Sequence, residues 1–358
     1  MTVERLTVRR LSVPLSVPYK LVFGPVTAFD TILVEAVSGD GERRGWGEAT
    51  ILTGYTDETV EAAWEAVCAK APELVGTDPE TGKRRAGAMH AATPFAGTAL
   101  ATALEMLEGH PMLAPDTAQR VAVLAIVNSV EPAEYRREIE ASLGEGFRTL
   151  KVKVGFDVDR DLARLSDIQD VVAGRAAIRV DANQGYSADE AVRFIRAVRP
   201  DGIELVEQTC AAGDWEAARK VAEAAGVAMM LDESIYGAED IDRAADLNCA
   251  EVIKLKLMKA GGLEELAGQL AQIGRHGMTA VLGNGVAGDI GCWMEACAAI
   301  GCGVTTAGEM NGFLKPTTRL FDLPLRLAAG DLVVGPGSDV VPDMAAIDRF
   351  TIDSKAFT

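Results

Sequence analysis

Short apolar runs alternate with longer amphipathic stretches along most of the chain after Val121. Seven of the eight runs precede a segment whose apolar residues recur at helical spacing, which indicates strands followed by helices. The repeat of roughly 25–30 residues favours parallel strands with right-handed crossovers, and eight strands in about 200 residues favour a closed barrel. The expected strands are 121–127, 149–154, 177–181, 203–207, 228–232, 251–257, 279–282 and 304–309, and the expected helices are 132–144, 159–173, 187–198, 214–225, 237–246, 262–276 and 288–300.

The first part of the chain has another pattern, in which strand-like alternation comes first and helical spacing follows. Residues 2–13 alternate like a strand that Pro14 and Pro18 should end, and residues 19–28 are typical of a loop. The other expected elements are strands at 31–37 and 45–48 and helices at 57–70 and 95–107.

These patterns predict an α/β protein with two domains. The (β/α)7–8 TIM-like barrel should cover residues 119–324, with an α+β capping domain formed by residues 1–118. The short strand-like pieces of the tail, residues 325–358, are expected to pack back on that capping domain.

Charge and cysteine usage narrow the function classes. A formal net charge of -18 over 358 residues disfavours nucleic acid and anionic membranes as partners, although a local metal or lysines can still attract an anionic substrate. The chain has no signal-peptide pattern at its start and no apolar run of transmembrane length. Six cysteines without CxxC spacing fit free thiols, so we expect a cytoplasmic protein.

Acidic residues end three successive strands of the predicted barrel: Asp181, Glu207 and Asp232. The carboxyl ends of barrel strands meet at one mouth, where three carboxylates repel one another unless a cation joins them. Oxygen ligands suit Mg²⁺ or Mn²⁺ better than zinc. The alternative is that each carboxylate merely caps the helix that follows its strand.

Lysines stand on both sides of this expected metal site. Strand alternation points Lys151 and Lys153 to one face, and Lys256 ends a strand across the barrel. Lys153 and Lys256 could remove a proton beside a metal-bound carboxylate if a nearby cation lowers the pKa of the lysine that acts as base. Their companions, Lys151 and Lys254, would either salt-bridge the carboxylates or contact the substrate.

Several short motifs in this order carry a resemblance that covers nearly the whole chain. They are Gly45-Trp-Gly-Glu48, Lys151-Val-Lys153, Asp181-Ala-Asn183, Glu207-Gln208, Asp232-Glu-Ser234 and Lys256-Leu-Met-Lys-Ala-Gly-Gly262. The set resembles the enolase superfamily, in its muconate-lactonizing-enzyme-like (mandelate racemase/muconate lactonizing enzyme) subgroup. That superfamily uses a lysine or histidine base with Mg²⁺ stabilising an enediolate.

The resemblance implies roles for the residues at the strand ends. Lys153 and Lys256 become the acid/base pair, and Asp181, Glu207 and Asp232 become the Mg²⁺ ligands. Lys151 would contact the substrate carboxylate or lower the pKa of Lys153.

The expected substrate contacts differ from those of some relatives. No histidine stands at the end of the seventh strand, which excludes the mandelate racemase type of base, and we assign no activity to the Gly283–Asp289 motif there. The eighth strand ends in Glu309, as in muconate cycloisomerases, and lacks the Asp-x-Asp usual in dipeptide epimerases. The other candidate substrate-binding residues are Asn183, Asn284 and, from the capping loops 16–30 and 50–58, Tyr19, Phe23 and Tyr55, for which plain packing is an equal alternative.

The expected function is Mg²⁺-dependent removal of the α-proton of a small carboxylate substrate, with isomerisation as the outcome. Both cycloisomerase and racemase or epimerase chemistry fit, and a lyase that dehydrates a β-hydroxy acid is the first alternative. A non-catalytic barrel that binds a metal or ligand is the alternative from another class. A homo-oligomer is expected.

Overall fold

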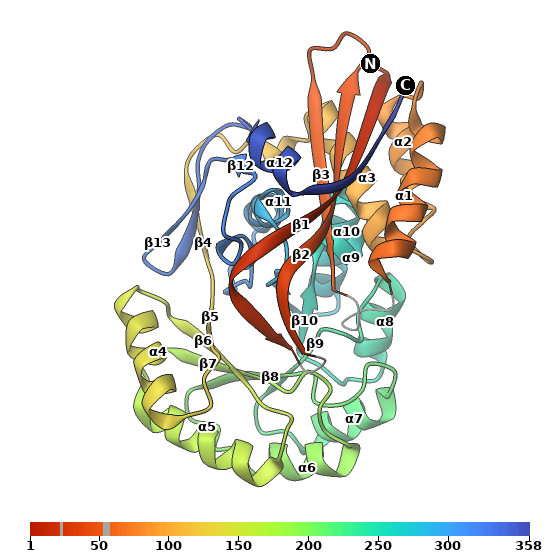
Figure 1. Ribbon diagram of the computed structural model, residues 1–358. Helices are drawn as coiled ribbons and strands as arrows, with labels where there is room; N and C mark the ends of the chain where they lie inside the picture. Colours follow the sequence, from red (N-terminus) through yellow and green to blue (C-terminus); the bar gives the residue numbers. More distant parts are fainter. Residues whose placement is uncertain (22–23, 53–57) are drawn as a thin grey trace.

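The computed structural model describes residues 1–21, 24–52 and 58–358. Within these residues, seven parallel strands form a curved sheet in the order β11-β10-β9-β8-β7-β6-β5, with helices outside it (Figure 1). The expected α/β barrel is therefore confirmed. Its strands are β5 Ala125–Val127, β6 Thr149–Lys153, β7 Ala177–Asp181, β8 Ile203–Glu207, β9 Ala228–Leu231, β10 Val252–Leu255 and β11 Thr279–Leu282. Its helices are α4 Pro132–Gly144, α5 Val158–Val172, α6 Ala188–Ala197, α7 Trp215–Ala224, α8 Ala238–Asp246, α9 Leu257–Ala260, α10 Leu263–Arg275 and α11 Asp289–Gly301.

The barrel closes through irregular backbone rather than through the eighth strand expected at 304–309. The Glu309 amide donates to the Leu282 carbonyl at 2.9 Å, and the Leu124 amide donates to the Gly308 carbonyl at 2.9 Å. The expected first strand is also split, because β4 (Gln119–Ala122) pairs with another sheet before β5 enters the barrel. Because the expected first strand is interrupted between β4 and β5, the closing segment pairs with it only through a local bridge of Val123 with Gly308.

The capping domain is an antiparallel sheet in the order β16-β1-β2-β3 with helices on one face (Figure 1). Alternating side chains serve two cores: Leu6 and Val8 pack towards the helices, whereas Leu33 and Trp46 join the core shared with the barrel. Both faces of this sheet are therefore buried. The elements are β1 Val3–Leu21, β2 Gly24–Ser38, β3 Arg44–Ile51, α1 Val60–Leu74, α2 Pro79–Gly87, α3 Pro94–Glu108, η1 Pro111–Leu113 and β16 Thr351–Phe357.

The expectation that Pro14 and Pro18 end the first strand, with a loop at 19–28, was wrong. β1 continues to Leu21 and pairs with β2 beyond the prolines, with an irregular register between Pro14 and Tyr19. β16 pairs with β1 only from Leu6 to Leu11. Further along, among the described residues, this edge carries only a local bridge of Leu15 with Pro316, in which Ser16 donates its amide N–H and Pro14 accepts through its carbonyl. Proline is tolerated at such an edge.

The tail divides between the two halves of the molecule. β16 joins the capping sheet beside β1, but β13 (Leu325–Ala328) and β14 (Asp331–Val334) form a sheet with β4 next to the barrel. The remaining elements are η2 Gly312–Leu314, β12 Phe321–Asp322, β15 Val341–Pro342 and α12 Met344–Phe350. The tail thus links both parts, and the domain limits at 118 and 324 stay predictions.

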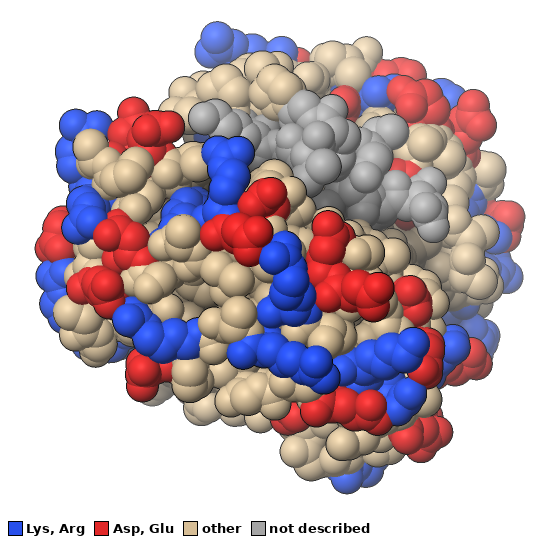
Figure 2. Space-filling view, turned by 90° about the horizontal axis from the view of Figure 1, so that it is seen from below, with Lys and Arg blue, Asp and Glu red and all other residues tan. Residues whose placement is uncertain are grey.

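The surface carries charges of both signs. Figure 2 shows acidic and basic side chains interleaved over the face turned to the viewer. In the described part of the chain, no helix combines the length and apolar character needed to cross a bilayer. The six cysteines, all of which the structure describes, are free, and Cys68 and Cys302 are partly exposed.

Candidate active site

The Lys151 ammonium group lies among three carboxylates inside the barrel. Its Nζ is 2.8 Å from Asp181 Oδ2, 2.8 Å from Glu207 Oε2 and 2.9 Å from Glu309 Oε2. The lysine is 1% exposed, because β6 lies between β5 and β7 and the lysine side chain points towards the carboxylates inside the barrel. Lys151 therefore salt-bridges the acids in this structure, which is one of the roles expected for it.

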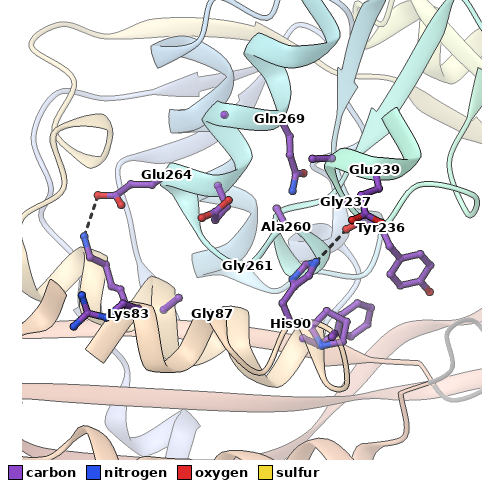
Figure 3. A pocket seen from close by; sticks show the side chains of 18 of the residues that line it. Lys83, Gly87, His90, Tyr236, Gly237, Glu239, Ala260, Gly261, Glu264 and Gln269 are labelled. Atoms are coloured by element: carbon purple, nitrogen blue, oxygen red, sulfur yellow. Dashed lines mark hydrogen bonds and ion pairs between the residues drawn. The ribbon is translucent and has the colours of Figure 1, made fainter. Parts of the chain in front are cut away.

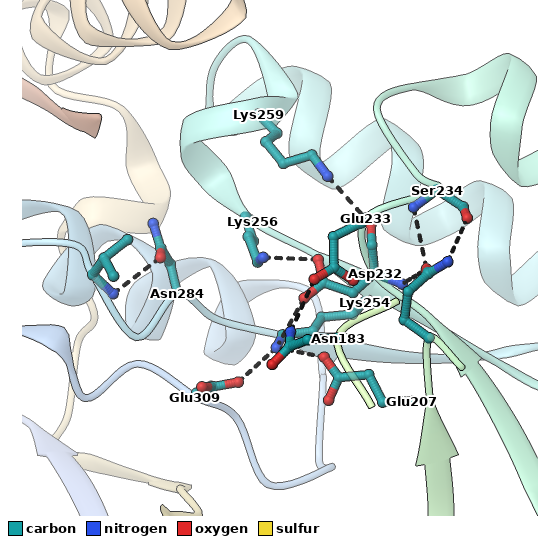
Figure 4. A network of polar contacts seen from close by, with 12 residues as sticks. Asn183, Glu207, Asp232, Glu233, Ser234, Lys254, Lys256, Lys259, Asn284 and Glu309 are labelled. Atoms are coloured by element: carbon teal, nitrogen blue, oxygen red, sulfur yellow. Dashed lines mark hydrogen bonds and ion pairs between the residues drawn. The ribbon is translucent and has the colours of Figure 1, made fainter. Parts of the chain in front are cut away.

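Lys254 on β10 does the same from the other side. Its Nζ lies 3.0 Å from Glu207 Oε1, 3.2 Å from Asp232 Oδ2 and 2.5 Å from Glu309 Oε2 (Figure 4). Each neighbouring pair of strand-end carboxylates thus shares an ammonium group. This sharing explains how buried like charges coexist at one barrel mouth.

Opposite charges decide most protonation states in this network. Burial opposes the charged forms, but Lys151 and Lys153 outweigh it and lower the pKa of Asp181 to about 2. Lys254 and Lys256 likewise hold the pKa of Asp232 well below its usual range in spite of burial. Burial and the adjacent Asp181 instead raise the pKa of Glu207. For the central carboxylate, burial and the neighbouring acids thus outweigh its two ammonium partners, Lys151 and Lys254.

The three strand-end acids offer an all-oxygen donor set to a metal. Asp181, Glu207 and Asp232 are at most 1% exposed and stand at the ends of β7, β8 and β9. Among the described residues, no three acidic, histidine or cysteine side chains are placed so that they could hold a metal ion, and ammonium groups lie between these carboxylates. The all-oxygen donor chemistry of these acids fits a hard divalent cation.

The two expected base lysines contact the outer members of the carboxylate row. Lys153 Nζ lies 2.6 Å from Asp181 Oδ2 and also donates to Asn183 Oδ1. Lys256 Nζ lies 2.8 Å from Asp232 Oδ1, on the other side of the network (Figure 4). The fold thus brings both lysines to one carboxylate cluster from opposite sides of the barrel.

Asn183 is positioned by the turn after β7. Its φ of 41° places it in the left-handed region, and its amide N–H donates to Asp181 Oδ1 at 2.9 Å. Its side chain accepts from Lys153 and donates to Glu233 Oε1 at 3.0 Å. Asn183 therefore connects Lys153, one of the two expected bases, to an acid at the end of β9, two strands away.

Sequence reasoning missed two charged residues of this cluster. Lys259 Nζ donates to the Asp232 carbonyl at 3.2 Å and lies 4.0 Å from the centre of the Tyr236 ring, and burial lowers its pKa to about 8. Burial and Asp232 raise the pKa of Glu233 to about 7. A signal existed, because Lys259 follows Lys256 by three residues on a helical turn and Glu233 is adjacent to Asp232.

The structure describes only some of the other predicted substrate residues. Asn284 is 2% exposed, accepts from the Val286 amide at 3.0 Å and donates to the Met258 sulfur, so its amide is engaged locally. Glu309 belongs to the lysine–carboxylate network. Phe23 and Tyr55 lie outside the described residues, and for Tyr19 only the backbone, paired with Val26, is described.

A separate cavity of about 1060 Å³ lies between the capping helices and the outer barrel helices (Figure 3). His90 Nε2 donates to the Tyr236 carbonyl oxygen at 3.2 Å there, and Lys83 forms an ion pair with Glu264 at 2.9 Å. None of the strand-end acids or base lysines lines it. The acids and lysines of the candidate site therefore lie in the lysine–carboxylate network and outside this cavity.

Comparison with known proteins agrees with this geometry. Residues 134–346 match the family model described as "Enolase C-terminal domain-like". The chain is 30% identical over 91% of its length, and 90% of the relative's, to L-Ala-D/L-Glu epimerase of Bacillus subtilis. It is 28% identical over 99% of its length, and 97% of the relative's, to muconate cycloisomerase 1-1 of Acinetobacter lwoffii.

Solved structures extend the likeness to the whole fold. A dipeptide epimerase of Enterococcus faecalis V583 in complex with Mg and the dipeptide L-Leu-L-Tyr has a TM-score of 0.87 at 25% identity, covering 95% of this chain and 100% of that one. The N-succinyl Arg/Lys racemase of Bacillus cereus has a TM-score of 0.92 at 21% identity, with full coverage of both chains, and shows the shared fold. The resemblance inferred from the strand-end motifs is confirmed. The chain belongs to the enolase superfamily and is an isomerase of its muconate-lactonizing-enzyme-like subgroup.

Proposed function

We propose that the chain binds Mg²⁺ through Asp181, Glu207 and Asp232 and racemises or epimerises a small carboxylic acid at Cα. The observation that carries the proposal is that Lys153 and Lys256 contact Asp181 and Asp232, at the two ends of the carboxylate row. Two bases on opposite sides are what inversion of a carbon centre requires. The Mg-containing structure of a related epimerase supports the choice of metal.

The side chains of the site divide the work. When bound, Mg²⁺ would stabilise the negative charge that develops on the substrate carboxylate. One lysine, uncharged, removes the α-proton from its face, and the other, as an ammonium group, returns a proton to the opposite face. Lys151 and Lys254 hold the acids in place through their ion pairs. A cycloisomerase, or a dehydratase that expels a β-hydroxyl, would need only one of the bases.

Proton exchange in D₂O tests this proposal. A library of small acids, including N-acyl amino acids and dipeptides, is incubated with the Mg²⁺-loaded protein, and α-deuterium and chirality are measured by NMR and chiral chromatography. Deuterium at Cα together with inversion is expected. Loss of water instead would indicate the lyase. Absence of exchange with every acid would indicate a non-catalytic barrel that only binds a metal or ligand.

Metal dependence is the second expected outcome. Chelation should abolish exchange, added Mg²⁺ should restore it, and Asp232→Asn should weaken Mg²⁺ binding measured by calorimetry, since it removes one charged oxygen ligand. Full exchange after exhaustive chelation would contradict the metal assignment.

The homo-oligomer and the cytoplasmic location stay predictions from the sequence.

A further inference from the structure

The cavity between α2 of the cap and the barrel helices α8 and α10 lies apart from the lysine–carboxylate network. Its volume of about 1060 Å³ is far larger than a single ion needs and is comparable to that of small-molecule sites. Two contacts between cap and barrel flank it, from His90 Nε2 to the Tyr236 carbonyl oxygen at 3.2 Å and from Lys83 to Glu264 at 2.9 Å (Figure 3). The walls of the cavity are thus held in place by the fold.

Negative charge predominates on these walls. Seven of the described lining residues are Asp or Glu, and two, Lys83 and Arg84, are basic. The Lys83 ammonium group is already shared by three carboxylates at 2.6 to 3.2 Å, those of Glu80, Glu108 and Glu264. Glu239 on α8 and Glu265 on α10 form no ion pair or hydrogen bond with any described residue. The cavity therefore carries carboxylates whose charge is not balanced by a neighbour.

A buried amide on α10 also lacks a partner. Gln269 lines the cavity, is 8% exposed and forms no hydrogen bond within the described part of the chain; Figure 3 shows its amide directed away from α10 into the cavity. Gln272 on the same helix, in contrast, donates to the Ala238 carbonyl at 2.9 Å and to Asp242 at 2.6 Å. A buried amide without a partner costs free energy, which a ligand in the cavity would recover.

We propose that this cavity binds a small organic dication with ammonium or guanidinium groups. Glu265 and Gln269 are one helical turn apart on α10, so their oxygens accept hydrogen bonds from one cationic group. Glu239, at the start of α8, pairs with the second cationic group. An anion or an apolar molecule would leave the carboxylates and the amide without partners. This site goes beyond the proposed function and does not depend on it.

Binding calorimetry on the full-length, Mg²⁺-loaded protein tests the inference. The probes are 1,5-diaminopentane and agmatine, which carry ammonium and guanidinium groups, and pentane-1,5-diol, which has the length of the diamine without its charge. One equivalent of at least one dication should bind per chain, and the diol should not bind. The bound dication should also raise the midpoint of thermal unfolding, because it binds only the folded chain.

Three variants locate the bound cation. Glu265→Gln and Gln269→Met should each weaken binding of the dication by about tenfold, the effect of one charge-assisted hydrogen bond. Gln269→Met should not lower the unfolding midpoint measured without ligand, because the amide that it removes has no partner to lose. Glu145→Gln is the matched control, since it removes the same charge at the exposed end of α4 outside the cavity, and it should leave the affinity unchanged.

Three results would overturn the inference. If neither dication binds, the cavity is not a cation site. If the diol binds as tightly as the diamine, charge does not select the ligand. If Glu145→Gln weakens binding as much as Glu265→Gln does, the dication is attracted only by the formal net charge of -18 and not by this cavity. Thermal unfolding of each variant verifies that a loss of binding is not a loss of folding.

Discussion

The ends of single lysine side chains determine what the barrel mouth can do. Lys151 and Lys153 are two residues apart on β6, yet Lys151 is 1% exposed and contacts three acids, whereas the Lys153 side chain is 26% exposed and contacts Asp181 and Asn183. The deeper lysine is needed to hold the acids together. The outer one, which also pairs with Asp181, is the one that we propose as a base.

Single alanine variants should separate the two bases. Lys153→Ala and Lys256→Ala should each lose racemisation by about 10²–10⁴, the usual contribution of a general acid or base. Each variant should still exchange the α-proton of the one enantiomer whose proton faces the surviving lysine. Chiral analysis of deuterated product checks this. Two variants that racemise at the wild-type rate would refute the two-base assignment, with exposed Lys220→Ala as the control.

At the scale of elements, β3 and α3 approach each other so closely that side chains do not fit between them. A Cβ at Gly45 would lie 1.9 Å from the Ala103 carbonyl oxygen, and one at Gly47 would lie 2.1 Å from the Ala99 carbonyl oxygen. Trp46, between them, points to the opposite face and joins the core shared with the barrel. Glycines in the Gly45-Trp-Gly-Glu48 motif are thus explained by packing.

Gly47→Ala should destabilise the protein by about 3 kcal/mol or more, because the added methyl group forces β3 away from α3. The free energy of unfolding from urea titration gives the measurement. Gly87→Ala, at the end of α2 with nothing within 4 Å of the added carbon, is the matched control. It should be neutral or stabilising by up to about 1 kcal/mol. Equal effects of both substitutions would contradict the packing explanation.

For the whole molecule, a buried carboxyl group joins the cap to the barrel. Glu48 at the end of the cap motif accepts from the Gly291 amide of α11 at 3.1 Å and is 6% exposed. Burial, and then the nearby Asp289, raise its pKa to about 8, and burial raises the pKa of the neighbouring Glu295 to about 7. The folded protein therefore holds protons there that the unfolded chain releases.

Glu48→Gln should make the protein more stable above neutral pH. Because the folded pKa of Glu48 exceeds the ordinary value of 4.5, wild-type stability is complete below that value and is lost as the pH rises towards about 8. The loss is at most about 1.4 kcal/mol per pH unit in this window, and the neutral amide removes it. Unfolding titrations from pH 5 to pH 8 measure the slope, and identical slopes for both proteins would contradict this prediction.

The sequence alone determined the order of elements and the strand-end chemistry. Local periodicity identified the seven regular barrel strands, and equal spacing brought Asp181, Glu207 and Asp232 to one mouth, because parallel strands of a barrel share their carboxyl end. The motifs at those ends also indicated the family. These are properties of short segments, which residue pattern and spacing describe well.

The tertiary structure decided what depends on residues distant in sequence. Whether Lys151 bridges acids or meets substrate depends on Glu309, which is 158 positions away. Three other features likewise depend on neighbours that no local pattern contains. They are the closing of the barrel by 304–309, the continuation of β1 past Pro14 and the position of Lys315 beside Gly285. Burial and charge at such contacts exist only after the chain has folded, so side-chain roles could not be assigned from spacing alone.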